Sequence, residues 1–222
     1  MKKNFIVFAA VFICLLTLSA CEKGNPYEKF VSEARTEIYS GTSENYDISA
    51  YYGSREQPAL NDGEIGEKIY ALSLRVNNGG IDQVKRTVTL EYERETYSGE
   101  LKLNIVTGVY GTEIEIKNFS PKEFTVTVSS GSDKEEVLLS SDIPENTIDY
   151  RTALNCLTEK QAELLTIYKD AQGNFNGEIR LKLLVKSGKP YWYVSLCAKS
   201  GKIRALLLDG FTGEPLAVRE IF

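Results

Sequence analysis

The sequence predicts a mainly β protein, in which an N-terminal antiparallel β-sandwich of Ig-like architecture precedes a small α+β region. From Ala34 to about Ser141, apolar and polar residues alternate in short runs. Such alternation is typical of strands with one buried face and one solvated face. After Ser141 the pattern changes to a helical one and then returns to short alternating runs. The 13 tyrosines support the β assignment, because tyrosine favours strands.

The predicted sandwich shows its strands as runs of period two. The clearest alternation falls in residues 69–76, 87–92, 101–105, 113–117 and 124–128. Clusters of Gly, Asn and Ser punctuate the runs at 61–63, 77–80, 98–99 and 129–133, and these residues favour turns. Seven or more short strands with turns between them favour a sandwich. The Cys…Trp…Cys pattern of immunoglobulin domains is absent from the sequence, so the likeness is one of architecture.

The last third predicts a helical region and four strands. Residues 147–156 are compatible with a helix, and Thr158 to Gln161 have the form of a capping box for a helix that ends near 172–174. Ala162, Leu165 and Tyr168 recur on one helical face. Strands are expected at 179–185, 191–198, 203–209 and 215–218. Their short connections imply antiparallel neighbours.

This last third resembles the end of a PepSY domain. The resemblance rests on Tyr191-Trp192-Tyr193-Val194 and on the run from Leu206 through Asp209-Gly210-Phe211-Thr212-Gly213-Glu214 to Ala217, after a helix in the right order. It covers about residues 147–222. The sequence departs from the family pattern at Pro215, where valine is usual, and in a longer strand at 177–186. The resemblance implies peptidase modulation or protein binding rather than catalysis.

The N-terminus has the form of a secretory signal. Lys2 and Lys3 precede an uncharged stretch from Asn4 to Ala20, whose 17 residues are short against the roughly 20 that cross a bilayer. Leu18-Ser19-Ala20-Cys21 resembles the lipobox of bacterial lipoproteins. That resemblance implies cleavage before Cys21, a diacylglycerol on its sulfur, and a membrane anchor on the extracytoplasmic side. Stable anchoring takes more than one acyl chain, a requirement that a diacylglycerol meets.

The expected organisation therefore has four parts. They are a lipoprotein signal peptide at 1–20, a lipidated tether at 21–33, the sandwich at 34–142 and the α+β PepSY-like domain at 143–222. Removing Lys2 and Lys3 from the 26 basic residues leaves 24 against 31 acidic residues, a net charge of −7. This balance argues against nucleic acid as a partner and against a polybasic grip on anionic lipid.

Histidine is absent from the sequence, which excludes Ser-His-Asp and Cys-His nucleophile pairs and histidine-containing zinc sites. Cys14 leaves with the signal and Cys21 carries the lipid, so Cys156 and Cys197 remain. Two alternatives stay open for this pair, a disulfide outside the cytoplasm or two buried thiols. No catalytic residue, cofactor or metal ligand is assigned.

Two features of the last third invite a binding interpretation. Tyr191, Trp192 and Tyr193 are either a platform for a partner or ordinary core and cross-strand residues. Asp209 and Glu214 bracket a turn and supply two carboxylates, whereas Ca²⁺ takes 6–8 oxygen ligands. The favoured interpretation is that Asp209 accepts hydrogen bonds from the turn and that Gly213 adopts a positive φ.

The sequence predicts a non-catalytic, membrane-anchored extracytoplasmic lipoprotein that presents a surface for a protein or peptide, such as a peptidase. Two alternatives remain. One is a cell-envelope hydrolase that uses an Asp/Glu pair, which requires two carboxyl groups in one cleft. The other is a solute-capture lipoprotein, against which the lack of α/β repetition argues.

Overall fold

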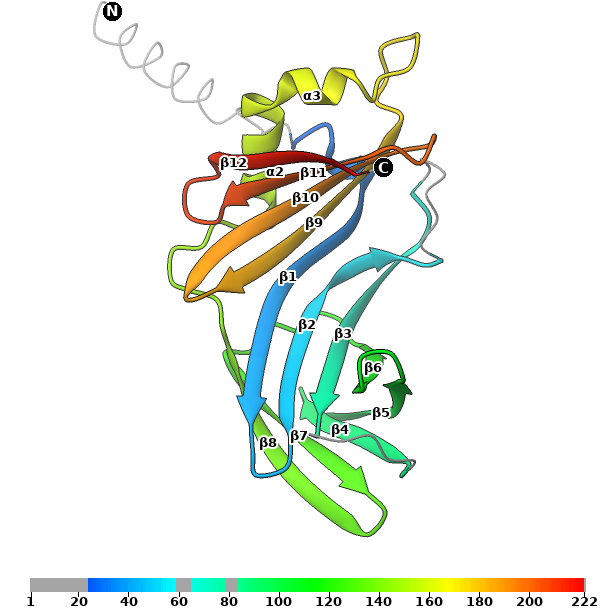
Figure 1. Cartoon of the computed structure of the whole chain (residues 1–222), viewed down its shortest axis with the longest axis vertical. Helices are drawn as coiled ribbons and strands as arrows, with labels where there is room; N and C mark the ends of the chain where they lie inside the picture. Colours follow the sequence, from blue (N-terminus) through cyan, green and yellow to red (C-terminus); the bar gives the residue numbers. More distant parts are fainter. Residues whose placement is uncertain (1–23, 59–64, 79–83, 222) are drawn as a thin grey trace, which may run out of the picture.

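The computed structural model describes residues 24–58, 65–78 and 84–221, and its strands form one sheet (Figure 1). The first eight strands are β1 Val31–Thr42, β2 Asp47–Glu56, β3 Lys68–Asn77, β4 Arg86–Tyr92, β5 Glu95–Asn104, β6 Val109–Glu115, β7 Glu123–Ser130 and β8 Asp133–Ser141. The last four are β9 Gly177–Lys186, β10 Lys189–Ala198, β11 Ile203–Asp209 and β12 Pro215–Ile221. The helical elements are the 3₁₀ turn η1 Glu28–Phe30, α2 Tyr150–Lys160 and α3 Ala162–Thr166.

The predicted sandwich is wrong, because the first eight strands close into a barrel. Their order is β1-β2-β3-β6-β5-β4-β7-β8, and β8 pairs back onto β1 through Tyr39–Ser141 and Ser40–Ser140. A barrel strand and a sandwich strand both have one buried face and one solvated face, so both give the same alternation. The two folds differ in whether the first and last strands pair with each other. Alternation of apolar and polar residues reports which face is buried, but it does not report which strands pair.

The predicted separate α+β PepSY-like domain is also wrong. The strands β9 to β12 continue the barrel sheet, because β9 pairs in parallel with the first half of β1, from Val31 to Arg35. β1 therefore belongs to both parts, with β9 as its neighbour at the start and β8 at the end. Figure 1 shows β1 running as one long strand between the upper and lower parts of the molecule.

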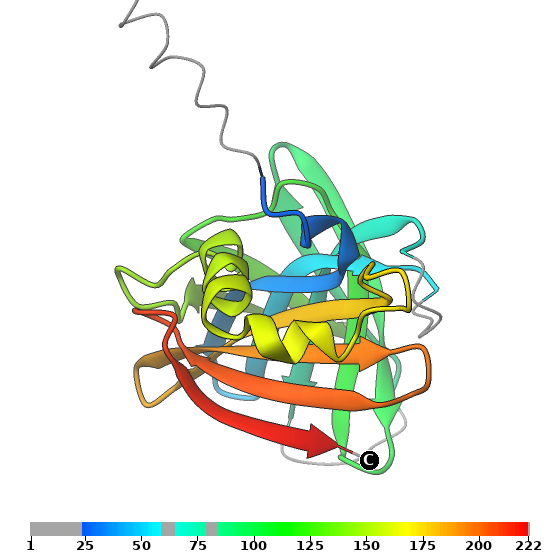
Figure 2. The ribbon, with the colours of Figure 1, turned by 90° about the horizontal axis from the view of Figure 1, so that it is seen from above.

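Two hydrophobic cores lie on the same side of this bent sheet. The first fills the barrel with side chains such as Ile48, Leu72 and Val126, which is how an eight-stranded barrel is normally occupied. The second lies between β9–β11 and the helices, where Leu154 and Leu157 meet strand residues. Figure 2 shows α2 and α3 lying over this part of the sheet.

An aromatic plug closes the barrel at the end nearest the helices. Phe119, in the loop between β6 and β7, is fully buried. Its ring lies 4.7–5.9 Å from the ring centres of Tyr39, Tyr52, Tyr92 and Phe124. The loop is held by the Tyr92 hydroxyl, which donates to the carbonyl of Asn118 at 3.0 Å. Edge-to-face and tilted ring pairs of this kind stabilise a core beyond their buried area.

The helical region begins nine residues before the capping box, at Asp149 instead of Thr158, which is more than two helical turns. Asp149, not Thr158, is the N-cap of α2, and its carboxylate accepts a hydrogen bond from the Thr152 amide at 2.7 Å. Thr158 lies inside α2, where its hydroxyl donates to the carbonyl of Asn155. Gln161 separates α2 from the short α3. The helical interpretation of residues 147–156 is confirmed from Tyr150 onward.

Residues 25–30, which the sequence assigned to a tether, are packed against the body. The Asn25 side-chain amide donates to Asn155 Oδ1 at 2.8 Å and to Thr158 Oγ1 at 3.1 Å. Tyr27 and Phe30 then place their rings 5.3 Å and 4.9 Å from that of Phe175. Cys21 lies outside the described residues.

Candidate functional site

The two neighbours of β1 leave a fork between them. Pairing with β9 ends at Arg35, and pairing with β8 begins at Tyr39. Between these points the edge of β1 carries Thr36, Glu37 and Ile38, and the Ile38 carbonyl accepts a hydrogen bond from the Asp142 amide at 3.0 Å. The chain after β8 crosses the open side of the fork and leads into α2.

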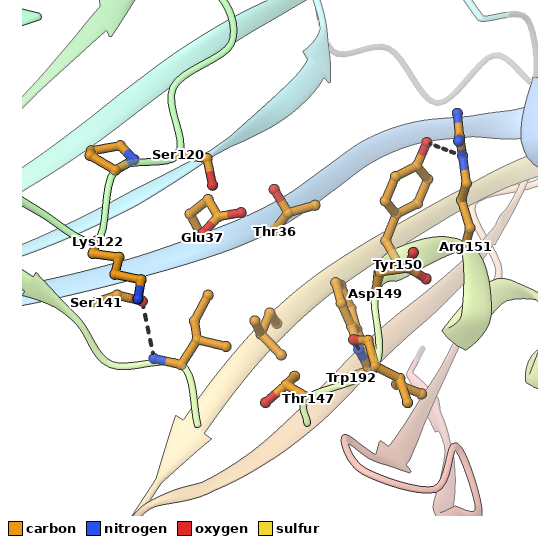
Figure 3. Close-up of a pocket in the computed structure, with 14 residues that line it drawn as sticks. Thr36, Glu37, Ser120, Lys122, Ser141, Thr147, Asp149, Tyr150, Arg151 and Trp192 are labelled. Atoms are coloured by element: carbon orange, nitrogen blue, oxygen red, sulfur yellow. Dashed lines mark hydrogen bonds between the residues drawn. The ribbon is translucent and has the colours of Figure 1, made fainter. Parts of the chain in front are cut away.

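A cleft of about 660 Å³ occupies this fork (Figure 3). Thr36 and Glu37 of β1 line it, together with the loop at Ser120–Lys122, the segment from Thr147 to Arg151, and Leu183 and Trp192 from below the helices. A second hollow of about 370 Å³ shares Thr36, Tyr150 and Arg151 with the first and continues along β2. We call the two together the junction cleft. Each of the two hollows falls within the usual range of small-molecule pockets, roughly 300–1,000 Å³.

A bulge in β1 turns Glu37 into the cleft. Ala34 pairs with Ser54, but after the register shift it is Glu37 that pairs with Tyr52, so Thr36 is the extra residue. Paired residues share a face of the sheet, so Glu37 points to the side of Tyr52 and the barrel plug. Gly53 permits this close approach, since a Cβ there would lie 2.0 Å from the Ala34 carbonyl oxygen.

Glu37 is a half-buried carboxylate that forms no ion pair with any described residue. Burial raises the pKa of its carboxyl above the ordinary glutamate value, and a hydrogen bond with the Ser120 side chain opposes that rise in pKa. Figure 3 shows Glu37 between Ser120 and Thr36. Lys122 lines the same cleft and also forms no ion pair within the described chain.

The other charged groups of the cleft serve the fold. Glu28 Oε1 accepts hydrogen bonds from the Tyr150 hydroxyl and from Arg151 Nε, each at 3.0 Å, which ties the N-terminal segment to the start of α2. The Asp149 carboxylate caps the same helix. Farther along the second hollow, burial lowers the pKa of Lys68, against the opposing effects of Glu28 and Glu56.

The described carboxylates of the junction cleft differ from the arrangement of a hydrolytic acid pair. Such a pair takes two carboxyl groups on either side of a substrate with their pKa values pushed apart. In the junction cleft Glu37 is the carboxylate turned toward open space, while Glu28 and Asp149 are held by partners within the fold. The arrangement suits recognition of a ligand group that donates hydrogen bonds or carries positive charge.

The three aromatic residues for which the sequence left a platform or a core role open lie on two faces of β10. Trp192 is 1% exposed beneath α2, where its Nε1 donates to the Ile148 carbonyl at 3.0 Å. Tyr191 and Tyr193 are half-buried on the opposite face of β10. Of the three residues, Trp192 alone is among those that line the junction cleft in the described structure.

Cys156 and Cys197 are free thiols, so the disulfide alternative is not formed in this structure. Cys156 is half-buried in α2, which covers the Leu196 face of β10, whereas Cys197 points to the other face. The sheet therefore separates the two sulfur atoms. Burial raises the pKa of the Cys197 thiol, which keeps it in the less reactive protonated form.

The turn interpretation of Asp209 is confirmed. Its carboxylate accepts hydrogen bonds from the Phe211 and Thr212 amides, each at 2.9 Å, and these bonds lower its pKa. Gly213 has the expected positive φ, of 68°. Glu214 is paired with Lys160 of α2. The two carboxylates that suggested a calcium site are thus engaged within the fold.

Sequence reasoning missed Glu37 and the junction cleft. A glutamate in an alternating run reads as a solvated strand residue, and the bulge that reverses its direction leaves no mark in composition. The cleft also depends on β9 pairing with β1 across more than a hundred residues, which local patterns do not encode.

Comparison with known proteins gives no family for the chain. No protein-family model matches it, and no curated protein matches its sequence. Among the helices of the described residues, none is both long and apolar enough to cross a bilayer.

Proposed function

We propose that this protein is a non-catalytic, membrane-anchored binding protein of the extracytoplasmic side, and that the junction cleft holds a protein or peptide segment. The anchor follows from the lipobox-like sequence at Cys21. One observation carries the binding site: a half-buried Glu37 faces open space at the fork of β1 without an ion-pair partner among the described residues. Uncompensated carboxylates of this kind are a mark of functional sites.

The lining indicates what such a segment offers. Ile143, Ile148 and Leu183 provide an apolar surface beside Glu37 and Lys122. Ligand sites commonly combine apolar walls with a few polar groups that fix orientation. A basic side chain whose aliphatic stem covers the apolar residues and whose cation reaches Glu37 fits both features.

The test uses the soluble ectodomain, residues 24–222, against a displayed library of random peptides. We expect enrichment of peptides that contain lysine or arginine, and at least tenfold weaker binding of the selected peptides to Glu37→Gln. Glu136→Gln is the matched control, because Glu136 is an exposed strand residue remote from the cleft lining. Selected peptides that bind Glu37→Gln as tightly as the native protein would contradict the proposal.

A further inference from the structure

We infer that the α2–α3 end of the molecule faces the bilayer and that the barrel points away from it, so that the junction cleft opens close to the lipid headgroups. This inference rests on the proposed anchor at Cys21. Its structural basis is the way in which residues 25–30 are fixed to the body.

The body holds the chain from Asn25 onward. Asn25 is bound to Asn155 and Thr158 of α2 through its side-chain amide, and its Oδ1 accepts from the Tyr27 amide at 2.9 Å. The ring contacts of Tyr27 and Phe30 with Phe175 follow at once. These contacts fix the exit point of the N-terminal chain at α2 rather than at the barrel.

The anchor is close to this exit point along the chain. Asn25 lies four residues after Cys21 in the sequence, and an extended chain spans at most about 3.6 Å per residue, or about 14 Å in total. Glu28, which lines the junction cleft, lies seven residues from Cys21 and so within about 25 Å of it. A lipid on Cys21 therefore leaves little room for the barrel to turn toward the membrane.

The charges of this end are mixed. Its side chains include Lys29, Lys160 and Lys169 as cations and Glu159, Glu163 and Asp170 as anions. Ile167, at the end of α3, is 52% exposed and adds an apolar contact. A basic patch that would attract anionic lipid is not formed by these six groups, so the orientation is set by the short connection to the lipid.

The two ends of the molecule offer positions for labels. Figure 1 shows the helices at one end of the long axis and the turn between β7 and β8 at the other. Ile167 is exposed at the first end, and Ser132 is exposed in the turn at the second. Cys197 is buried and the anchor blocks Cys21, so a Cys156→Ser background leaves a single introduced thiol for labelling.

The experiment measures energy transfer from a donor on Ile167→Cys or Ser132→Cys to an acceptor lipid, using the full lipidated protein in phosphatidylcholine vesicles. We expect several-fold more efficient transfer from position 167 than from position 132. Equal efficiencies, or a higher efficiency at position 132, would overturn the orientation while leaving the anchor in place.

Two further measurements distinguish the lipid anchor from electrostatic docking as the cause of the orientation. Cys21→Ala should abolish transfer at both positions, and vesicle binding that survives this change would overturn the anchor and the orientation together. Raising the ionic strength from about 0.1 M to about 1 M shortens the Debye length from about 10 Å to about 3 Å. The ratio of the two transfer efficiencies should not change, and its collapse in salt would show electrostatic docking instead of a tethered geometry.

Discussion

Glu37 keeps a carboxylate partly out of water without a cation beside it, and this is unfavourable to folding when the group is charged. Because its pKa is raised in the folded state, the folded protein binds the proton more tightly than the unfolded chain does. The contribution of Glu37 to stability is then most favourable below the ordinary glutamate pKa of 4.5 and falls as the pH rises toward and through the folded value. Neutral pH lies on the destabilised side.

Glu37→Gln should therefore be slightly more stable than the native protein at pH 7, although it loses ligand binding. The gain should disappear near pH 4, where the native glutamate is largely protonated in both states. Urea denaturation at the two pH values measures it, with Glu136→Gln as the control for a solvated carboxylate. A variant less stable than the native protein at pH 7 would show that Glu37 supports the fold instead.

Gly213 is a second residue whose identity the structure explains. It has a φ of 68°, and an added Cβ would lie 2.3 Å from Cys156 Sγ. A left-handed conformation costs a residue with a Cβ about 1–2 kcal/mol.

Gly213→Ala should therefore lose more than this amount of unfolding free energy, because the clash with α2 adds to the backbone term. Gly201→Ala isolates the backbone term, since Gly201 has a φ of 82° and nothing within 4 Å of its added Cβ. Denaturant titration of both variants compares the two losses. Equal losses would mean that the turn and α2 are not held at the separation seen here.

At the scale of elements, the loop between β6 and β7 closes one end of the barrel core with the buried side chain of Phe119. Phe119→Ala would leave a cavity among four aromatic neighbours and should cost about 3–5 kcal/mol. Phe119→Leu should cost less, because it retains most of the apolar volume. Thermal and denaturant unfolding provide the measurement, and a loss below about 1 kcal/mol for Phe119→Ala would show that the plug is peripheral.

The positions of the strands could be predicted from the sequence, but the pairing between strands could not. The runs at 69–76, 87–92, 124–128 and 191–198 all lie within observed strands, because alternation reports which side chains are buried. The closure of β8 onto β1 and the parallel pairing of β9 were missed. Both are set by the length of β1, which is long enough to hold one neighbour at each end.

The candidate site was less predictable than the strands. Trp192 was singled out from sequence with two interpretations, a binding platform or a core residue, and its buried position beside the cleft fits the core one. Glu37 depends on the bulge at Thr36 and on the close approach at Gly53. The bulge and the close approach both depend on how β1 pairs with β2, so they cannot be predicted from the sequence of either strand alone.

At the scale of the whole molecule, β1 and β2 contribute side chains to both cores, so we expect the two cores to unfold as one cooperative unit. Trp192 is the single tryptophan and lies in the core under α2, so its fluorescence reports on that core. Leu72→Ala, in the barrel core, should lose about 2–5 kcal/mol. The loss should shift the fluorescence midpoint and the circular-dichroism midpoint together. A fluorescence midpoint that stays in place would show that the two cores unfold independently.

The parallel pairing of β1 with β9 also determines how the molecule carries mechanical load. Under the proposed function, a pull between the lipid and a bound partner would enter the body at Asn25 and pass along β1, whose first half is bonded to β9. Tension along a strand loads all of its inter-strand hydrogen bonds at once, in shear, rather than opening them one after another. Under the proposed function, the fold would therefore offer its stronger mechanical direction to the force between anchor and ligand.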